Sequence, residues 1–436
     1  MSIISRSLTV LLAMGAAAQA GAVAAQSTSG SLRSAASQSV DLFARDRSVA
    51  VRDRPHPEYE AFGLRLGAFT AYPKLDVGTE YNDNIYAVAS GEVSDTILRL
   101  KPEISITSGW SRNAISAYAR GAFSRYSDYD SEDTDDYGFG ASGRLDVTRA
   151  ANLLAGADFA HLAEPRTSSS APASTVSPIE YDMASAYLAG SQTRGRVRFS
   201  ARGDVRSFTY EDGRTIGGAV VEQGDRDRTI SSVTGRTDVA LSPATALFVQ
   251  ATGNSRDYDV ASTPLNPARD SSGYEVLAGA NFEVGALARG EVAAGYIQQE
   301  FDSPAFGDVS GLGARASIEY FPTQLTTLTT TVSRTVEDAA IVGAGGYLSS
   351  SIGLQADHEL LRNVILGGQL TYAEDDYEGI DRTDERLSAS LRATYLVNRR
   401  LGVSLAASSF KQTSSGTNEG VDFKVNRLML SLVGQF

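Results

Sequence analysis

The chain ends in a segment whose side chains alternate regularly enough to predict its conformation. Reading back from the terminal residue, every second position is apolar or small: Phe436, Gly434, Leu432, Leu430 and Leu428. The positions between them are mostly polar, with two apolar exceptions: Gln435, Val433, Ser431, Met429 and Arg427. A period of two places alternate side chains on opposite faces of a β-strand. The last residues therefore predict a strand with one apolar face and one mostly polar face.

The same alternation recurs over residues 74–436. In its clearest example, residues 196–206, one face carries Val197, Phe199, Ala201, Gly203 and Val205. The opposite face carries Arg196, Arg198, Ser200, Arg202, Asp204 and Arg206. Segments 137–147, 274–284 and 387–397 repeat the pattern, and a helical period of 3.6 is not sustained over them. The pattern predicts an all-β chain.

The connections between these segments alternate in length and chemistry. Short ones are often basic, as at 149–152, 193–196 and 397–400, whereas long ones are acidic, as at 127–136, 211–228 and 374–385. Transmembrane antiparallel β-barrels of the bacterial outer membrane show this alternation, with tight periplasmic turns and longer outer loops. We therefore expect a barrel of about 18 strands, with 16 possible, whose last strand pairs with its first.

In such barrels a closing strand that ends on an aromatic residue resembles the signal read by the barrel-assembly machinery. That signal would here comprise Leu428, Leu430, Leu432, Gly434 and Phe436. Aromatic residues near the loop ends of the strands also predict a girdle at the membrane interface: Tyr81, Tyr126, Tyr129, Tyr210, Tyr258, Phe301 and Tyr377.

The N-terminus predicts export. Arg6 precedes an apolar stretch at 8–18 and small residues at 23–25, which together are typical of a signal peptide over residues 1–25. Residues 26–73 are expected to form a periplasmic N-terminal segment that is partly disordered, and 74–436 the barrel. Within that segment, residues 62–72 predict either a short extra strand or a stretch tucked into the periplasmic mouth.

The composition excludes several functions. A net charge of −13 argues against nucleic-acid binding, because no basic patch is available to neutralise phosphates. The chain has no Cys and three His, and no Ser lies in a recognisable nucleophile motif, so we expect no catalytic site, no cofactor and no His/Cys metal site. Acidic loops such as 128–136 could share a divalent cation, but a solvated loop is the favoured interpretation.

Several segments resemble one known family, the putative β-barrel porin 2 family. They are Asp53-Arg-Pro-His-Pro-Glu-Tyr59, residues 63–73, Glu80-Tyr-Asn-Asp-Asn-Ile-Tyr86, residues 358–363 and 375–381, and the closing 427–436. The resemblance covers nearly all of the expected mature chain. It implies an outer-membrane barrel, and a link to exopolysaccharide export, with which many members are associated. It assigns no functional residues.

The polar face of the strands provides the candidate site, since in a barrel it points into the lumen. The candidate pore-lining residues are Arg99, Lys101, Arg144, Asp146, Arg196, Arg198, Arg202, Arg206, Arg236, Asp238, Arg315, Glu319 and Arg392. Charged rows of this kind select which solutes pass a pore. Alternatively, these residues pair with one another and fill the lumen with a salt-bridge network.

We therefore expect a conduit for polar solutes or polysaccharide, associated with exopolysaccharide export. A general passive porin is the first alternative, and a structural or adhesive surface barrel with a closed lumen is the second. The expected partners are outer-membrane lipid and lipopolysaccharide, the barrel-assembly machinery, and periplasmic polysaccharide-export proteins.

Overall fold

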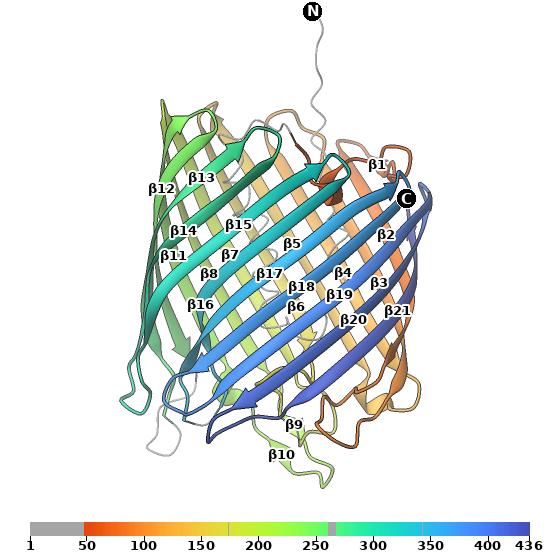
Figure 1. Ribbon diagram of the computed structural model, residues 1–436, viewed down its shortest axis with the longest axis vertical. Coiled ribbons are helices and arrows are strands. Elements are labelled where there is room, and N and C mark those ends of the chain that lie inside the picture. Colours follow the sequence, from red (N-terminus) through yellow and green to blue (C-terminus); the bar gives the residue numbers. More distant parts are fainter. Residues whose placement is uncertain (1–47, 173, 260–266, 342) are drawn as a thin grey trace, which may run out of the picture.

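The described chain forms one closed antiparallel barrel. The computed structural model describes residues 48–172, 174–259, 267–341 and 343–436, so the expected signal peptide and residues 26–47 lie outside it. Within the described residues the barrel has 18 strands, which confirms the predicted fold class and strand number (Figure 1). No helix in this part of the chain is both long and apolar enough to cross a bilayer.

The barrel strands run in chain order and each pairs with its sequence neighbours. They are β2 (Phe69–Asn82), β3 (Asp95–Ser108), β4 (Ala114–Tyr126), β5 (Thr134–Thr148), β6 (Ala151–Ala163), β7 (Glu180–Arg194), β8 (Val197–Tyr210), β11 (Arg228–Ser242), β12 (Thr245–Tyr258), β13 (Ser271–Val284), β14 (Ala288–Phe301), β15 (Val309–Thr323), β16 (Thr326–Asp338), β17 (Gly346–Leu361), β18 (Val364–Tyr377), β19 (Thr383–Asn398), β20 (Leu401–Ser415) and β21 (Phe423–Gln435). The small elements are η2 (Val51–Asp53), β1 (Leu64–Leu66), η3 (Asp130–Glu132), β9 (Gly213–Arg214), β10 (Val220–Val221) and η4 (Gly224–Arg226).

The last strand closes the barrel against the first, as the terminal pattern predicted. β21 pairs with β2 in a register that runs from Lys74 opposite Gln435 to Asn82 opposite Arg427. β2 begins at Phe69, ahead of Lys74, because Pro73 continues the strand: its carbonyl accepts a hydrogen bond of 3.1 Å from the Phe436 amide. Past the end of β21, the short strand β1 pairs with residues 69–71 of β2 and extends the same edge.

The connections divide the barrel into two ends. Tight turns, such as the one between β5 and β6, gather at one end, here called the turn end, which is uppermost in Figure 1. Long connections, such as residues 164–179 and 211–227, gather at the other, here called the loop end. In barrels of this class the tight turns face the periplasm and the loops face outward. This arrangement follows the alternation of short basic and long acidic segments in the sequence.

The two faces of each strand have opposite chemistry and opposite exposure. Phe199 on the outer face of β8 is 53% exposed, whereas the neighbouring Arg198 is 9% exposed. Leu391 on the outer face of β19 is 70% exposed. Apolar side chains left on the outside would be unfavourable in water, but they are favourable when the surrounding medium is hydrocarbon. Burial therefore follows the period of two, with charged side chains inward.

The predicted aromatic girdle is wrong for several of its residues. Tyr377 is only 5% exposed, Tyr210 stacks on Tyr181 at 5.0 Å between ring centroids, and Phe301 packs against an inner apolar cluster. These residues lie near the loop end, but their position in the alternation points them inward. Exposed rings on the outer face include Tyr81, which belonged to the prediction, and Tyr137, Tyr274 and Tyr296, which did not. The position of a residue along its strand sets its depth in the membrane. Whether it faces lipid or the lumen depends only on its place in the alternation of the strand.

We predict that an arginine on the outer face is far more damaging than one on the inner face. Leu391→Arg places a charge in the middle of the apolar band and should cost about 2–4 kcal/mol of folding free energy. Ser390→Arg, one residue away on the inner face, should cost less than about 1 kcal/mol. Folding into lipid vesicles under a urea titration measures both, and equal costs would contradict the assignment of faces.

Candidate functional site: the lumen and its two mouths

The inner face carries charges that are mostly paired. Arg99 donates to both carboxylate oxygens of Glu80 at 2.9 and 3.1 Å. Arg236 donates to Asp238 at 2.9 Å and to Glu291 at 2.8 Å. Both guanidinium groups are largely buried, and a buried cation without a partner would be strongly unfavourable. These pairs therefore hold charge in the wall of the lumen without leaving it unbalanced.

The candidate pore-lining residues that lie within strands all occupy inward-facing positions. Those in ion pairs are Arg99, Arg144, Asp146, Arg202, Arg236, Asp238, Arg315 and Glu319. Lys101 and Arg198 lie on the same face of β3 and β8, and Arg196 lies exposed in the turn before β8. Within the described residues, Arg206 and Arg392 form no ion pair. Whether any of these residues contacts a solute stays a prediction.

Aromatic rings on the same face support several of the arginines. The guanidinium carbon lies 4.1 Å from the ring centre of Tyr187 for Arg202, 3.6 Å from Phe248 for Arg236, and 4.7 Å from Phe208 for Arg228. A ring face attracts a cation and restricts its motion. These rings were not among the predicted lumen residues, although they occupy the same alternate positions as the inner arginines, which could have identified them.

At the loop end, the tip of the β16–β17 hairpin bends into the lumen. The pairing of β15 with β16 stops at Ala314 opposite Arg334, while β16 stays paired with β17 as far as Asp338 opposite Gly346. The freed tip packs inward, with Val336 and Leu348 in one buried cluster with Ile297 and Val309. A side chain at Gly345 would meet the Phe301 ring at 2.8 Å, so this glycine permits the close approach.

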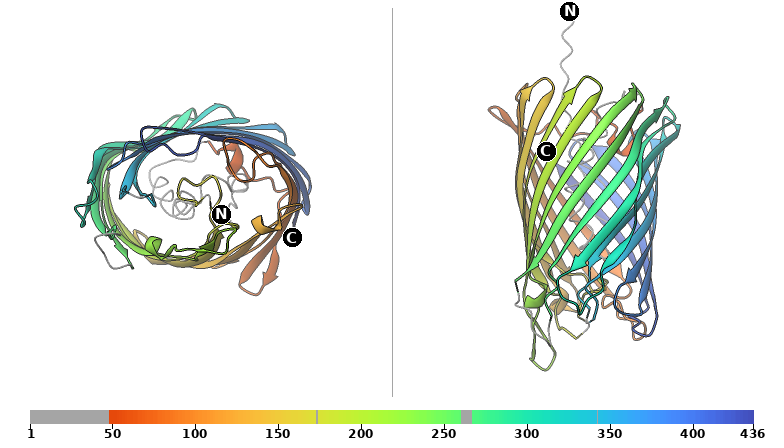
Figure 2. Two further views of the ribbon diagram at one scale, coloured as in Figure 1. Left: turned by 90° about the horizontal axis from the view of Figure 1, so that it is seen from below. Right: turned by 90° about the vertical axis from the view of Figure 1, so that its left-hand side faces the viewer.

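Ion pairs across the lumen hold the inward tip. Asp338 accepts hydrogen bonds from Arg228 on β11 at 2.9 Å and from Arg256 on β12 at 2.5 Å. Three strands, β13 to β15, separate β12 from β16 along the wall, so these bonds span the interior. Figure 2 shows the barrel as an elongated ring with chain segments inside it. The tip and its ion pairs narrow the loop-end mouth.

The connection 164–179 is fixed by neighbouring loops. Arg166 donates to both oxygens of Glu132 at 2.6 and 3.0 Å, and Glu132 is 1% exposed. Glu164 accepts two bonds of 2.8 and 2.9 Å from Arg226 in η4. Both pairs are bidentate, the arrangement that makes an Arg–carboxylate contact strongest. The loops around this side of the mouth therefore form one ion-paired layer.

These loop pairs also shift ionisation. Burial opposes the charge of Arg226, but the Glu164 carboxylate prevails and raises the pKa of the guanidinium. The pKa of the neighbouring Asp227 is raised chiefly by burial, and the backbone amide of Tyr210 opposes this shift. At neutral pH the Arg226 guanidinium is consequently held in its charged form, bound to the Glu164 carboxylate.

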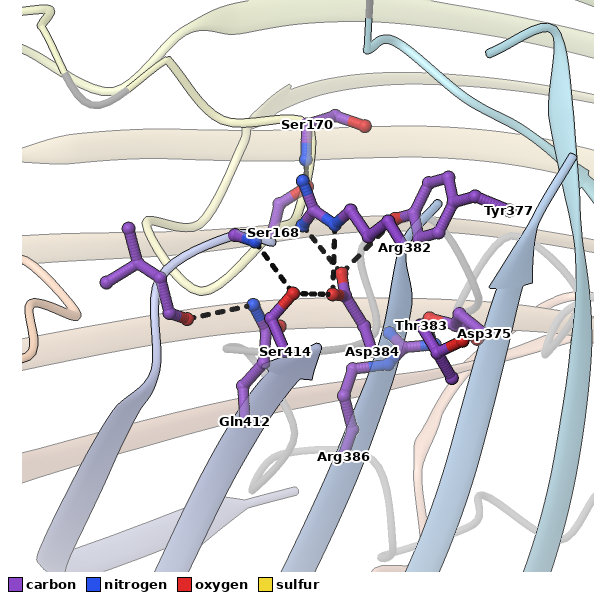
Figure 3. A network of polar contacts seen from close by, with 12 residues as sticks. Ser168, Ser170, Asp375, Tyr377, Arg382, Thr383, Asp384, Arg386, Gln412 and Ser414 are labelled. Carbon is purple, nitrogen blue, oxygen red and sulfur yellow. Dashed lines mark hydrogen bonds and ion pairs between the residues drawn. The ribbon is translucent and has the colours of Figure 1, made fainter. Parts of the chain in front are cut away.

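The opposite wall of the mouth carries a second polar cluster, centred on Asp384. This carboxylate accepts from Arg382 at 2.6 and 2.9 Å and from Ser414 at 2.5 Å. Figure 3 shows Ser168 and Ser170, from the connection 164–179, beside Arg382. Since β6 and β7 lie far from β18 to β20 around the barrel, this connection crosses the mouth from one wall to the other.

At the turn end, residues before β1 lie in the other mouth. The Val51 amide donates to Thr327 at 2.9 Å, and Val51 is fully buried. Arg52 donates to Glu319 at 2.6 Å, and Arg54 donates to Glu359 at 2.5 Å. Burial raises the pKa of the adjacent Asp53, against the effect of Arg52. This segment, residues 48–54, is therefore anchored to the inner faces of β15, β16 and β17.

A cavity of about 650 Å³ remains beside the anchored segment. It is lined by that segment and the residues just after it, and by the ends of β15 and β17 with their following turns, including Arg54, His56, Tyr59, Phe321, Gln324 and Arg362. Residues 48–54 thus narrow the turn-end mouth, and a cavity remains beside them.

The acidic loops hold their carboxylates in protein contacts. Asp133 accepts from the Tyr126 amide at 2.7 Å, and Asp135 accepts from Arg125 at 2.5 Å. Among the residues that the structure describes, no group of three His, Asp or Glu side chains is placed to hold a metal ion. These contacts give the loop carboxylates a structural use, whereas the sequence had favoured a solvated loop.

The terminal residues of the expected assembly signal lie on the outer face of the closing strand. Leu428, Leu430, Leu432 and Phe436 are each more than half exposed, while the alternating Met429 and Ser431 are buried. The two apolar exceptions in the terminal pattern, Met429 and Val433, therefore belong to the inner face. Recognition of this strand by the assembly machinery stays a prediction.

The chain is similar to a known family in sequence and to outer-membrane barrels in fold. A family model described as putative beta-barrel porin 2 matches residues 56–436. A comparison with curated protein sequences gives no match. The siderophore receptor PirA from Pseudomonas aeruginosa is 9% identical, with a TM-score of 0.45 over 84% of this chain and 80% of that chain. The outer membrane protein opdK from the same species is 11% identical, with a TM-score of 0.42 over 84% of this chain and 99% of that chain.

We predict that the loop layer depends on its buried ion pair. Glu164→Ala leaves the Arg226 guanidinium buried without its carboxylate, which should cost about 3–5 kcal/mol of local stability. Arg125→Gln removes a half-exposed pair on the outer face near the same mouth and should cost at most about 1 kcal/mol. Amide hydrogen exchange over 164–179 reports both, and similar protection in the two variants would disprove the assigned role.

Proposed function

The chain belongs to the putative beta-barrel porin 2 family, and from this premise we propose that it is a gated conduit that exports an exopolysaccharide. As a porin-type barrel it lies in the bacterial outer membrane. The proposal adds two features to the family assignment: the chain narrows its own lumen at both mouths, and the passing solute is a hydroxyl-rich polymer.

The narrowing of both mouths by chain segments carries the proposal of a gate. Residues 48–54 are anchored through Arg52 and Arg54 at the turn end, and the β16–β17 tip is held by Asp338 at the loop end. Each segment is held by a few charge-assisted bonds beside its apolar packing, at Val51 in the first and at Val336 and Leu348 in the second. A barrel of this strand number encloses more space than wall side chains can fill. Segments held by separable contacts therefore favour a pore that opens over one that is permanently packed.

The chemistry of one wall favours a hydroxylated solute. The inner face of β16 is lined almost wholly by hydroxyl groups: Thr327, Thr329, Thr331, Ser333 and Thr335. In register with Thr329, the inner faces of β17 to β20 carry Gln355, Gln369, Ser390 and Ser408. Neutral hydroxyl and amide groups can form hydrogen bonds with sugar hydroxyls. These bonds are weaker than those that charged side chains would form, so the sugar can move on.

A general passive porin is the alternative within transport. It would let small polar solutes through, and it would need no partner. Deletion of the gene separates the two: loss of secreted polysaccharide with small-solute uptake unchanged supports the exporter. Loss of small-solute uptake with secretion unchanged supports the general porin.

A barrel with a closed lumen is the second alternative, and the paired charges of the lumen favour it. Arg99 with Glu80 and Arg236 with Asp238 are bonds that a solute would have to pass or break. Such a barrel would act through its acidic loops as a structural or adhesive surface protein. Absence of conductance in every variant, with attachment lost after loop trimming, would select it.

We predict that releasing the N-terminal anchor opens the pore. The double variant Arg52→Gln/Arg54→Gln removes the ion pairs to Glu319 and Glu359 without altering the wall, so single-channel conductance in planar bilayers should rise severalfold. The control Arg65→Gln removes an exposed arginine of β1 and should leave conductance unchanged. Equal conductance in all three proteins would contradict a gate at this mouth.

We also predict a change of ion selectivity when unpaired lumen arginines are removed. Arg206 and Arg392 form no ion pair within the described residues, so Arg206→Gln/Arg392→Gln should shift the reversal potential in a salt gradient toward cation preference. The shift is best measured in the background of the released anchor. Arg125→Gln, on the outer face, is the matched control, and an unchanged reversal potential would count against the inner placement.

A further inference from the structure

Two lysines lie directly opposite each other on the outer face of the closing strands. Lysine is rare in this chain, occurring only at 74, 101, 411 and 424. In the pairing of β20 with β21, Lys411 is opposite Lys424, and both side chains are exposed. Like charges in directly opposed positions destabilise a strand pair. An anion placed between the two ammonium groups would remove that cost.

The depth of the pair in the membrane matches a headgroup. The outer face of β20 is apolar at Leu401, Val403, Leu405 and Ala407, then changes to Ser409 and Lys411. A strand tilted by roughly 40° rises about 25 Å between Leu401 and Lys411, which is the height of the apolar band of such barrels. The lysines therefore lie at the outer boundary of the hydrocarbon, on the loop side, where lipid phosphates are found.

The inner face beneath the lysines is firmly packed. The neighbouring rungs of the same strand pair, Phe410 with Val425 and Gln412 with Phe423, point inward. Phe410, Phe423 and Val425 form a buried cluster with Ala87, and the two rings lie 5.8 Å apart. The Lys424 carbonyl also accepts a bond of 3.0 Å from the side-chain amide of Asn84, which is 1% exposed. The backbone that carries both lysines is thus held in place.

Within the described residues, neither lysine has an ion-pair partner. The outward carboxylate on the next strand, Glu385, lies opposite Thr413, and it forms no ion pair with Lys411 or Lys424. By contrast, the outward Arg125 on β4 is paired with Asp133 and Asp135. The lysine pair therefore presents two cations that the described protein does not neutralise.

We propose that Lys411 and Lys424 together bind a phosphate group of an outer-leaflet lipid, as in lipopolysaccharide. The ammonium group is a compact donor that binds phosphate as a point charge, and two of them can contact different oxygens of one phosphate. The site goes beyond the proposed conduit and does not depend on it. It would fix one lipid molecule at the seam beside the closing strand.

The test measures binding of purified diphosphoryl lipid A to the refolded full-length barrel in detergent. In Lys411→Gln/Lys424→Gln the affinity should fall about tenfold or more, and the thermal stabilisation by the lipid should be lost. Lys411→Arg/Lys424→Arg should retain binding, and so should the control Arg125→Gln. Heat-modifiable migration on gels verifies folding of each variant. If the glutamine variant does not fold, loss of lipid binding in the arginine variant, which keeps both charges, would contradict the proposal.

The source of the phosphate is distinguished by two further probes. Lipid A without phosphate should bind about as weakly as the glutamine variant binds the intact lipid. Inorganic phosphate at millimolar concentration should not displace the lipid. If it does, the site binds soluble phosphate and the assignment to a lipid is wrong. Unchanged lipid affinity in the glutamine variant, or equal loss in Arg125→Gln, would overturn the proposal.

Discussion

Every other feature of this barrel depends on one constraint: in hydrocarbon, a backbone amide without an acceptor costs several kcal/mol. The sheet must therefore close, and the register between β2 and β21 supplies that closure. Once it is closed, each strand has a lipid face and an inner face, and the period of two assigns each residue to one of them. The outer leucines, the inner arginines and the lumen itself all follow from the same ladder of hydrogen bonds.

Inside the lumen, electrostatics decides what can stay. An arginine removed from bulk water needs a partner, and most of the inner arginines have one, either a carboxylate or the face of a ring. The same rule explains how chain segments are retained there. The inward tip of β16–β17 and residues 48–54 are both fixed where a carboxylate meets a guanidinium group. An ion pair has a specific geometry, but its arginine can leave one carboxylate for another. This property suits two chain segments that would have to move aside to open the lumen.

The outer surface follows a complementary rule. Charges there are confined to the two boundaries of the apolar band, because a charge in the middle has no solvent and no partner. At the loop-side boundary, Arg125 is neutralised by its own loop, whereas Lys411 and Lys424 face each other. The contrast between these two sites indicates how a membrane protein can use cationic side chains either for internal cohesion or, as we propose, for contact with lipid.

The sequence alone predicted the fold class, the strand number, the closing pair and the inner parity of Arg99, Arg236 and the other candidates, because a period of two is a local property of the chain. It did not predict which aromatic residues face outward when nearness to a loop was used in place of parity, as for Tyr377. The tertiary structure alone decided that Asp338 reaches Arg228, that Glu164 reaches Arg226, and that Arg52 and Arg54 occupy the turn-end mouth. Those contacts join residues far apart in the chain, and they arise only after the sheet has closed and brought strands that are not neighbours within reach of one side chain.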